Sequence, residues 1–214
     1  MAENIIVVEN LNKSYKENQV LKNVSASFKK GEIHGIIGRN GSGKTVLIKA
    51  ICGFVLPDSG AIIVNGKVIG KDTDFPHDIG VIIEAPGFLP SLSAFKNLQY
   101  LASLRGIIGK DEIEKAILMV GLQPAEKKGV GKYSLGMKQR LGLAQAIMEN
   151  PSILILDEPM NGLDKSGIAE MRDLFLSLKA VGKTIILISH SAEDIELLCD
   201  TVHEMDGGIL TKVR

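Results

Sequence analysis

The apolar residues of this chain fall into short runs of two kinds, separated by glycine-containing and charged turns. Residues 153–156 and 184–188 are almost entirely aliphatic, as in strands of a parallel sheet that is buried on both faces. Near the N-terminus, residues 5–8, 24–28 and 61–67 are bounded by polar turns and predict further strands. We therefore predict an α/β fold in which an antiparallel sheet lies beside a parallel core.

Between these groups of strands, from Ser91 to about Met148, the pattern changes to helical spacing. Asp111 and Glu114 have the spacing of a capping box and predict a helix that starts there. Three apolar residues of this helix share one face: Ile113, Ile117 and Val120. The stretch predicts a helical subdomain inserted into the α/β core.

After Asn150 and Pro151 the chain returns to alternating strands and a helix. That helix places five apolar side chains toward the core: Ile168, Met171, Leu174, Phe175 and Leu178. We expect a single domain over residues 1–214, made of a core at 1–90 and 149–214 and a helical subdomain at about 91–148. With 214 residues, of which 45% are hydrophobic, the chain can bury a substantial core.

A glycine-rich segment follows the apolar residues at 33–37 and precedes a helical pattern at 46–51. It fits the form G-x-x-x-x-G-K-[ST] with Gly38, Arg39, Asn40, Gly41, Ser42, Gly43, Lys44 and Thr45. Its glycines let backbone N–H groups point at phosphate oxygens, and the positive end of the following helix adds to the attraction. Lys44 then contacts the phosphates, and the Thr45 hydroxyl is placed to ligate Mg²⁺. The segment predicts a nucleoside triphosphate site, in preference to a glycine-rich turn with a solvated lysine.

Two acids follow the buried strand predicted at residues 153–156. The carboxyl ends of parallel strands form the edge at which open α/β sheets bind ligands. Asp157 is therefore placed to hold Mg²⁺ through a water, and Glu158 to orient and deprotonate the attacking water. Taken with the phosphate loop, the two acids predict hydrolysis of the nucleotide.

The amino-acid composition narrows the classes of binding partner and indicates the cellular compartment. Lys and Arg total 25, as do Asp and Glu, so the bulk charge gives no support to a nucleic-acid partner. Cys52 and Cys199 stand in apolar surroundings without metal-ligand spacing, and we expect reduced core residues. We recognise no signal peptide and no apolar run near the roughly 18 residues that span a bilayer. We expect a cytosolic protein, with any membrane path in another polypeptide.

Residues 133–140 read YSLGMKQR and lie shortly before the acidic strand. We expect a helix to begin here with Ser134 at or near its cap, so that the free N–H groups form a second anion-binding site. The segment resembles the signature motif of ATP-binding cassette (ABC) proteins, LSGGQ followed by Q-x-R. Tyr133, Leu135 and Met137 depart from that motif, whereas the serine, glycine, glutamine and arginine match it: Ser134, Gly136, Gln139 and Arg140.

The resemblance extends along almost the whole chain and implies a P-loop NTPase (RecA-like) core. Asn161-Gly162-Leu163-Asp164 resembles the D-loop of the family, and Tyr15 stands where an aromatic residue stacks on adenine. Read from the residues alone, Tyr15 fits packing in a strand-rich region equally well. The family pattern further implies ATP and Mg²⁺ as ligands, and a homodimer in which Ser134 and Gly136 of one subunit cover the γ-phosphate held by the other. It also implies an integral membrane permease as partner, with the ATPase on the inner face of the cell membrane.

His190 resembles the switch histidine of the same family. It follows the aliphatic strand at 184–188 and precedes a helix cap expected at Ser191, which places it at the same sheet edge as Asp157. There an imidazole can donate a hydrogen bond to the γ-phosphate. We expect the other histidines, His34, His77 and His203, to be structural.

Glu84 stands where most transport cassettes carry a glutamine that touches Mg²⁺ and links the core to the helical subdomain. Together with residues 85–98, it resembles the ATPases of bacterial bacitracin-resistance and lantibiotic-immunity transporters, which pair with separate permeases. A carboxylate here is attracted by the metal and repelled by the nucleotide, so we expect it to sense the hydrolytic state. The alternative is a plain acidic residue in a surface loop.

Three functions stay open from the sequence. The first is the ATPase subunit of a multisubunit ABC transporter, for export of peptide antibiotics or immunity to them. The second is an ABC ATPase that acts on ribosomes or DNA, although such proteins usually carry two phosphate loops or long coiled coils, and this sequence has neither. The third is a P-loop kinase or switch GTPase, which would leave the signature, the D-loop and His190 without roles.

Overall fold

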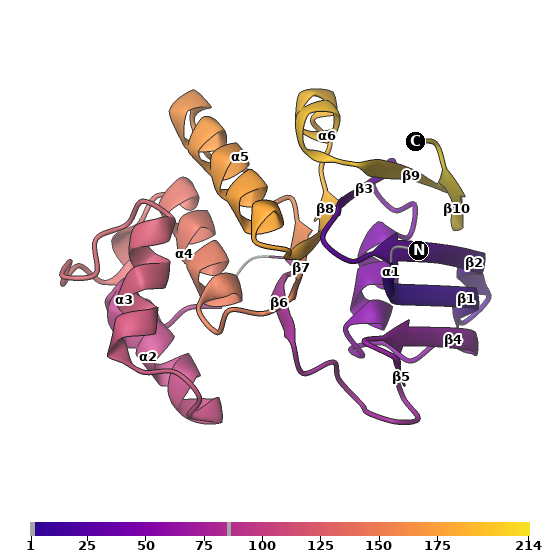
Figure 1. The fold of residues 1–214 in the computed structure, drawn as a ribbon, viewed down its shortest axis with the longest axis horizontal. Helices are drawn as coiled ribbons and strands as arrows, with labels where there is room; N and C mark the ends of the chain where they lie inside the picture. Colours follow the sequence, from indigo (N-terminus) through magenta and orange to yellow (C-terminus); the bar gives the residue numbers. More distant parts are fainter. Residues whose placement is uncertain (1–2, 85–86) are drawn as a thin grey trace.

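A computed structural model describes residues 3–84 and 87–214 of the chain. Its larger sheet runs in the order β10-β9-β3-β8-β7-β6 (Figure 1). The strands are β3 (Ile33–Ile37), β6 (Ile79–Ile82), β7 (Ile153–Asp157), β8 (Thr184–Ile188), β9 (Thr201–Asp206) and β10 (Ile209–Lys212). All neighbours pair in parallel except β10, which runs antiparallel to β9. The predicted parallel core is confirmed, and β6, β9 and β10 are additional to the predicted strands.

Strand β7 is aliphatic up to its last residue because both faces of the sheet are covered at this position. Its four aliphatic residues are all at most 1% exposed. Ile153 and Ile155 belong to the core cluster on one face of the sheet, and Leu154 and Leu156 to the cluster on the other. Because both faces are covered, the strand is apolar throughout and carries its acids only at the carboxyl end.

The smaller sheet is antiparallel, as predicted, and runs in the order β2-β1-β4-β5. It contains β1 (Asn4–Tyr15), β2 (Asn18–Lys29), β4 (Ser59–Val64) and β5 (Lys67–Val68). Helix α1 (Lys44–Ile51) packs between this sheet and the parallel sheet, with its apolar face in the same core cluster as Phe28 and Ile62. The helix that follows the phosphate loop is therefore held from both sides.

The predicted helical stretch contains α2 (Ala94–Arg105), α3 (Lys110–Met119), a 3₁₀ turn (Val130–Lys132) and α4 (Leu135–Ile147). The predicted start of α3 was wrong. The helix begins at Lys110, and the Gly109 N–H donates to Glu112 Oε2 at 2.9 Å, so Glu112 takes the position expected for Glu114. Glu114 instead forms an ion pair with Lys110. The predicted apolar face is buried, with Ile113, Ile117 and Val120 at most 2% exposed.

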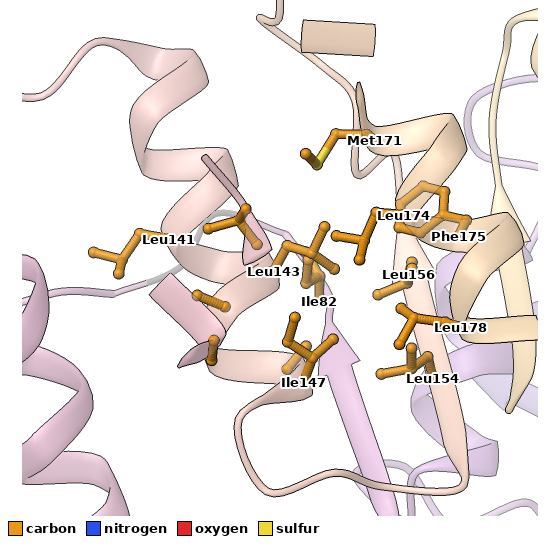
Figure 2. Packing of buried hydrophobic residues seen from close by; sticks show 14 of the residues in the cluster. Ile82, Leu141, Leu143, Ile147, Leu154, Leu156, Met171, Leu174, Phe175 and Leu178 are labelled. Atoms are coloured by element: carbon orange, nitrogen blue, oxygen red, sulfur yellow. The ribbon is translucent and has the colours of Figure 1, made fainter. Parts of the chain in front are cut away.

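Helix α5 (Lys165–Ala180) connects β7 to β8, and α6 (Ala192–Leu198) connects β8 to β9. The apolar face of α5 points into the core as predicted, with Ile168 only partly buried. Figure 2 shows Leu174, Phe175 and Leu178 beside Leu154 and Leu156 of β7. No helix in the described residues is long and apolar enough to cross a membrane.

Gly80 allows helix α4 to lie close to the parallel sheet. A Cβ atom at this position would lie 1.9 Å from the carbonyl oxygen of Ala146 in α4. Only glycine therefore lets β6 approach the end of α4 this closely. Strand β6 ends at Ile82, so this contact also places the segment that carries Glu84.

Candidate active site

A pocket of about 350 Å³ lies where the phosphate loop meets the carboxyl end of β7. Its lining comes from the loop, the two acids, the histidine after β8 and one residue of β2: Val20, Asn40, Gly41, Gly43, Lys44, Thr45, Val46, Asp157, Glu158 and His190. One cavity thus brings together a residue expected to bind phosphate (Lys44), two expected to hold a metal (Thr45 and Asp157) and one expected to activate water (Glu158), from segments more than 100 residues apart in the sequence.

The phosphate loop needs glycine at two positions for steric reasons. Gly38 and Gly43 have φ values of 142° and 115°, which other residues rarely adopt. A Cβ atom at Gly38 would lie 2.2 Å from the Met205 carbonyl oxygen, and one at Gly43 would lie 2.9 Å from that of Val20. The loop is therefore pressed against β9 and β2, which fixes the direction of its N–H groups.

Lys44 is 7% exposed and points along the loop. Its Nζ donates to the carbonyl oxygens of Gly38 at 2.7 Å and Arg39 at 3.0 Å, which leaves one of its three donors for an anion. Burial lowers the pKa of Lys44, and the nearby Asp157 and Glu158 oppose this shift. The Ser42 hydroxyl is also buried and has no hydrogen-bond partner within residues 3–84 and 87–214. The Lys44 ammonium and the Ser42 hydroxyl can each donate a hydrogen bond to a phosphate oxygen.

Thr45 and Asp157 offer oxygen atoms to a metal. The Thr45 hydroxyl donates to Asp157 Oδ2 at 3.3 Å. Burial raises the pKa of Asp157 and the Glu84 carboxylate raises it further, whereas the Thr45 hydrogen bond and Lys44 lower it. A hydroxyl and a carboxylate are the hard ligands that Mg²⁺ prefers, with the remaining positions filled by phosphate and water. Within the described parts of the chain there is no cluster of three or more His, Cys, Asp or Glu that could hold a metal ion.

Glu158 and His190 face each other across the pocket. The Glu158 backbone is left-handed at φ 49°, and its Oε1 is buried with no hydrogen bond to any residue that the structure describes. His190 Nε2 lies 3.5 Å from that oxygen and 3.0 Å from Asn40 Oδ1. Burial raises the pKa of Glu158, and the histidine counteracts part of this shift. A carboxylate with a raised pKa and a free oxygen has the properties of a general base.

Ser134 caps α4 as expected. Its Oγ accepts a hydrogen bond from the Met137 N–H at 3.2 Å, and both Ser134 and Leu135 are exposed. Neither Ser134 nor Gly136 lines the pocket of its own chain. The predicted anion site at this helix end is therefore presented outward, where a second subunit can reach it.

The first turn of α4 also has contacts within the chain. A Cβ atom at Gly136 would lie 2.8 Å from the Gly162 carbonyl oxygen, so this glycine packs the signature segment onto the predicted D-loop. Gln139 Nε2 donates to the Glu158 carbonyl oxygen at 3.1 Å. Asp164 caps α5 by accepting from the Gly167 N–H at 2.9 Å. The roles of these residues toward a neighbouring subunit stay predictions.

Tyr15 and Arg39 do not line the pocket. The Tyr15 ring is 48% exposed at the end of β1, with Lys13 Nζ 5.5 Å from its centre. Its stacking on adenine stays a prediction. Gly38 and Arg39 line a neighbouring cavity of about 720 Å³ that also includes His190.

Glu84 is neither free nor inside the pocket. Its Oε1 lies 2.6 Å from Lys49 Nζ on α1, while its side chain is 66% exposed and its backbone has a φ of 61°. Of the segment that suggested a peptide-antibiotic transporter, Ala85 and Pro86 lie outside the described residues. Whether Glu84 contacts a metal held by Asp157 stays a prediction; its carboxylate is one of the groups that raise the pKa of Asp157.

Sequence reasoning missed the roles of Lys49 and Gln139. Lys49 follows Lys44 and Thr45 by about one helical turn, and this spacing places it on the same side of α1. Its partner, however, is 35 residues away and cannot be deduced from local spacing. Gln139 matches the signature motif, but its hydrogen bond to the Glu158 carbonyl oxygen forms only in the folded chain and could not be predicted from the motif.

Comparisons with known proteins place the chain among nucleotide-binding transport subunits. The family described as ABC transporter matches residues 21–161. An uncharacterized ABC transporter ATP-binding protein, YybJ of Bacillus subtilis (strain 168), is 46% identical over 206 residues, which cover 96% of this chain and 94% of that protein. The bacitracin transport ATP-binding protein BcrA of Enterococcus faecalis is 42% identical over 212 residues, covering 98% of this chain and 69% of that protein.

Solved structures with the same fold agree with this placement. A nucleotide-free ATP-binding cassette from an ABC transporter is 26% identical and superimposes with a TM-score of 0.86, covering 99% of this chain and 92% of the other. A dimeric cassette bound to ADP and Pi has the same TM-score at 23% identity, over 98% of this chain and 99% of that one, which is a likeness of fold.

Proposed function

The chain belongs to the ABC transporter family, and from this premise we propose that it is the ATPase subunit that energises a separate membrane permease. The observation that carries the proposal is the single pocket that brings Lys44, Thr45, Asp157, Glu158 and His190 together. A kinase or GTPase would need the phosphate loop but would leave the Glu158 and His190 pair without a role.

We assign each side chain of the pocket one task. Lys44 and the loop N–H groups bind the phosphates, and Thr45 and Asp157 hold Mg²⁺. When bound, the metal neutralises charge on the phosphates. The free Glu158 Oε1 accepts the proton of the attacking water, and His190 donates a hydrogen bond toward the γ-phosphate.

The exposed cap of α4 supports action as a head-to-tail dimer. Ser134 and Gly136 lie outside the pocket of their own chain, so a second copy has to supply them to complete the site. A positive helix end with an exposed hydroxyl suits the γ-phosphate of the opposite subunit. We therefore expect ATP turnover per chain to rise with protein concentration in the range where the monomer dominates.

Mixing two inactive variants tests this arrangement. Lys44→Ala removes phosphate binding, whereas Ser134→Arg blocks the helix end. A mixed dimer contains one intact site, made of the phosphate loop of the Ser134→Arg chain and the signature of the Lys44→Ala chain. We expect the mixture to regain ATPase activity that neither variant has alone. Ser103→Arg on the exposed surface of α2 is the matched control and should behave like the wild type. A mixture as inactive as its parts would refute the dimer model.

For the transported substrate we propose a peptide antibiotic, on the basis of the 42% identity to the bacitracin transport protein. The chain would then work on the inner face of the cell membrane beside its permease.

An exposed aromatic pair, Phe54 and Phe75 with ring centres 6.1 Å apart, offers apolar area for a protein partner.

Co-purification with the product of a neighbouring permease gene, followed by ATPase assays with bacitracin or a lantibiotic, tests the partner and the substrate. Stimulation by ribosomes or DNA in place of the permease would instead support the alternative ABC function.

A further inference from the structure

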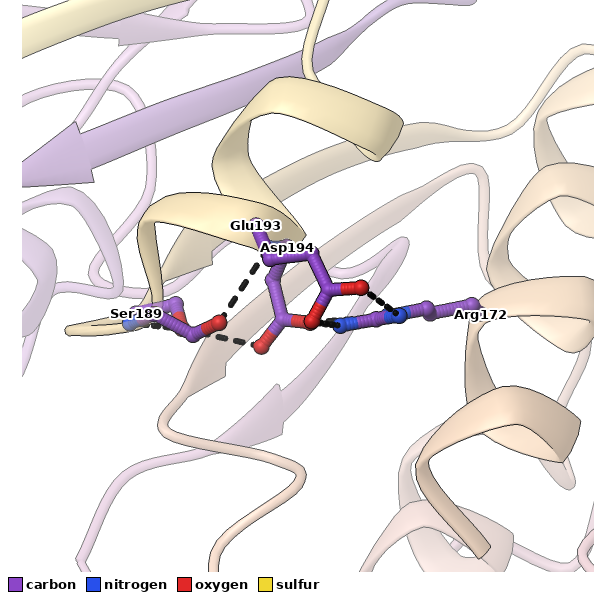
Figure 3. A network of polar contacts seen from close by, with 5 residues as sticks. Arg172, Ser189, Glu193 and Asp194 are labelled. Carbon is purple, nitrogen blue, oxygen red and sulfur yellow. Dashed lines mark hydrogen bonds and ion pairs between the residues drawn. The ribbon is translucent and has the colours of Figure 1, made fainter. Parts of the chain in front are cut away.

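Arg172 of α5 and Asp194 of α6 form an ion pair, and Figure 3 shows it beside Ser189, the residue before His190. The guanidinium donates to Asp194 Oδ1 from Nε at 2.8 Å and from Nη2 at 2.5 Å. The Asp194 side chain is 5% exposed, and Arg172 is the cationic partner of its carboxylate. Arg172 also contacts the exposed Glu193, which fixes the plane of the guanidinium.

Asp194 reaches both residues that flank His190. Its Oδ2 accepts a hydrogen bond from Ser189 Oγ at 3.4 Å, and its N–H donates to Ser191 Oγ at 3.2 Å. The Ser191 N–H in turn donates to Ser189 Oγ at 3.1 Å. The backbone on each side of His190 is therefore held by a closed set of hydrogen bonds that includes Asp194.

On the proposed function, in which His190 contacts the γ-phosphate, we propose that Arg172 and Asp194 are positioning residues for His190. Through Asp194, Arg172 ties the segment around His190 to α5, and α5 begins at Lys165 directly after its cap, Asp164, in the predicted D-loop. Asp164 and Arg172 are eight positions apart, which corresponds to about 12 Å along a helix. Movement of the D-loop against a second subunit thus reaches His190 through one helix and one ion pair.

The test compares two matched substitutions. Asp194→Asn weakens the pair that contacts the His190 segment. Asp200→Asn weakens another pair between α5 and the region after α6, in which Lys179 Nζ lies 2.5 Å from Asp200 Oδ1. We expect Asp194→Asn to lower kcat about tenfold and to leave the affinity for ATP within twofold. Asp200→Asn should leave both within twofold.

Each substitution is then combined with His190→Ala. If Asp194 acts only by positioning His190, Asp194→Asn should change kcat by less than twofold once the imidazole is absent. Arg172→Lys repeats the test from the other side of the pair, because lysine keeps the charge but loses the two-nitrogen fork. Arg172→Lys also replaces Asp194→Asn in the test if the Asp194→Asn variant does not fold.

Three results separate the possibilities. An equal tenfold loss in the wild-type and His190→Ala backgrounds would overturn the inference, and so would an equal loss from Asp200→Asn. A wild-type chain that binds ATP but does not hydrolyse it, alone or with its permease, would overturn the proposed function itself. Loss confined to the background that contains His190 supports the positioning role.

Discussion

His203 makes the fold sensitive to acid. Its ring is 5% exposed on β9, packs 5.3 Å from the centre of Phe28, and has an Nδ1 atom without a partner among the described residues. Burial, together with smaller contributions from the neighbouring His34 and Lys212, lowers the pKa of His203 to about 4. The folded protein therefore keeps this imidazole neutral at a pH at which the unfolded chain protonates it.

The sign and size of the effect follow from this difference. Between the unfolded value of 6.5 and the folded pKa of about 4, the unfolded state binds more protons, so stability falls as the pH falls. At 1.36 kcal/mol per pH unit the full loss is roughly 3 kcal/mol, and roughly 2 kcal/mol of it occurs by pH 5. For a chain of this length, the loss of roughly 2 kcal/mol by pH 5 corresponds to a melting temperature lower by about 4–8 °C.

Thermal unfolding at pH 7 and pH 5 measures this loss, and His203→Gln and His203→Phe isolate it. Asp157 and Glu158 have pKa values raised by burial, so their protonation acts in the opposite direction and is common to all three proteins. We expect the melting temperature of both variants to fall less than that of the wild type between the two pH values, whatever their stability at pH 7. An equal fall in the wild type and both variants would refute the assignment to His203.

Three further substitutions probe the pocket and its support. Glu158→Gln should keep ATP binding and lower kcat by about 10²–10⁴, while a dimer that is stable in ATP accumulates on a sizing column; near-normal hydrolysis would assign the base to another group. Glu84→Gln breaks the contact with Lys49, and we expect ATPase activity within about tenfold (1.4 kcal/mol in barrier) but a larger loss of antibiotic protection, reproduced by Lys49→Met. Equal losses in both assays would make Glu84 an ordinary catalytic ligand. Gly80→Ala should overpack against Ala146 at a cost of about 1–3 kcal/mol, which lowers the melting temperature by about 2–12 °C. Gly109→Ala is the control: this position has no close contact, and the melting temperature should change by less than about 2 °C. An equal change in both variants would refute the packing argument.

The sequence was most informative where function depends on neighbouring residues. The phosphate loop and the acids after β7 could be predicted because their chemistry requires fixed residue types at fixed spacing. The cap at Ser134 followed from local helix chemistry in the same way and is confirmed by its bond to the Met137 N–H. The division into a core and a helical subdomain stays a prediction.

Features that depend on distant contacts were missed. Strand β9 mixes polar and apolar residues, and its burial comes from pairing with β3, in which His34 lies opposite Thr201. The start of α3 was misplaced because several acids cluster there and spacing alone does not select Glu112. The Lys49 and Glu84 pair joins two segments whose proximity only the fold creates.

The hydrogen bond from Gln139 to the Glu158 carbonyl oxygen has a consequence for how two nucleotides communicate. In the proposed dimer, α4 serves the nucleotide of the neighbouring subunit, whereas Glu158 serves the nucleotide of its own chain. Each chain carries this link once, so a symmetric pair has two equal routes between its sites. Linkage requires that the first ATP changes the affinity for the second by the same factor as the second changes the first. If this hydrogen bond couples the two sites, we expect a defect in one signature to alter nucleotide affinity in both pockets.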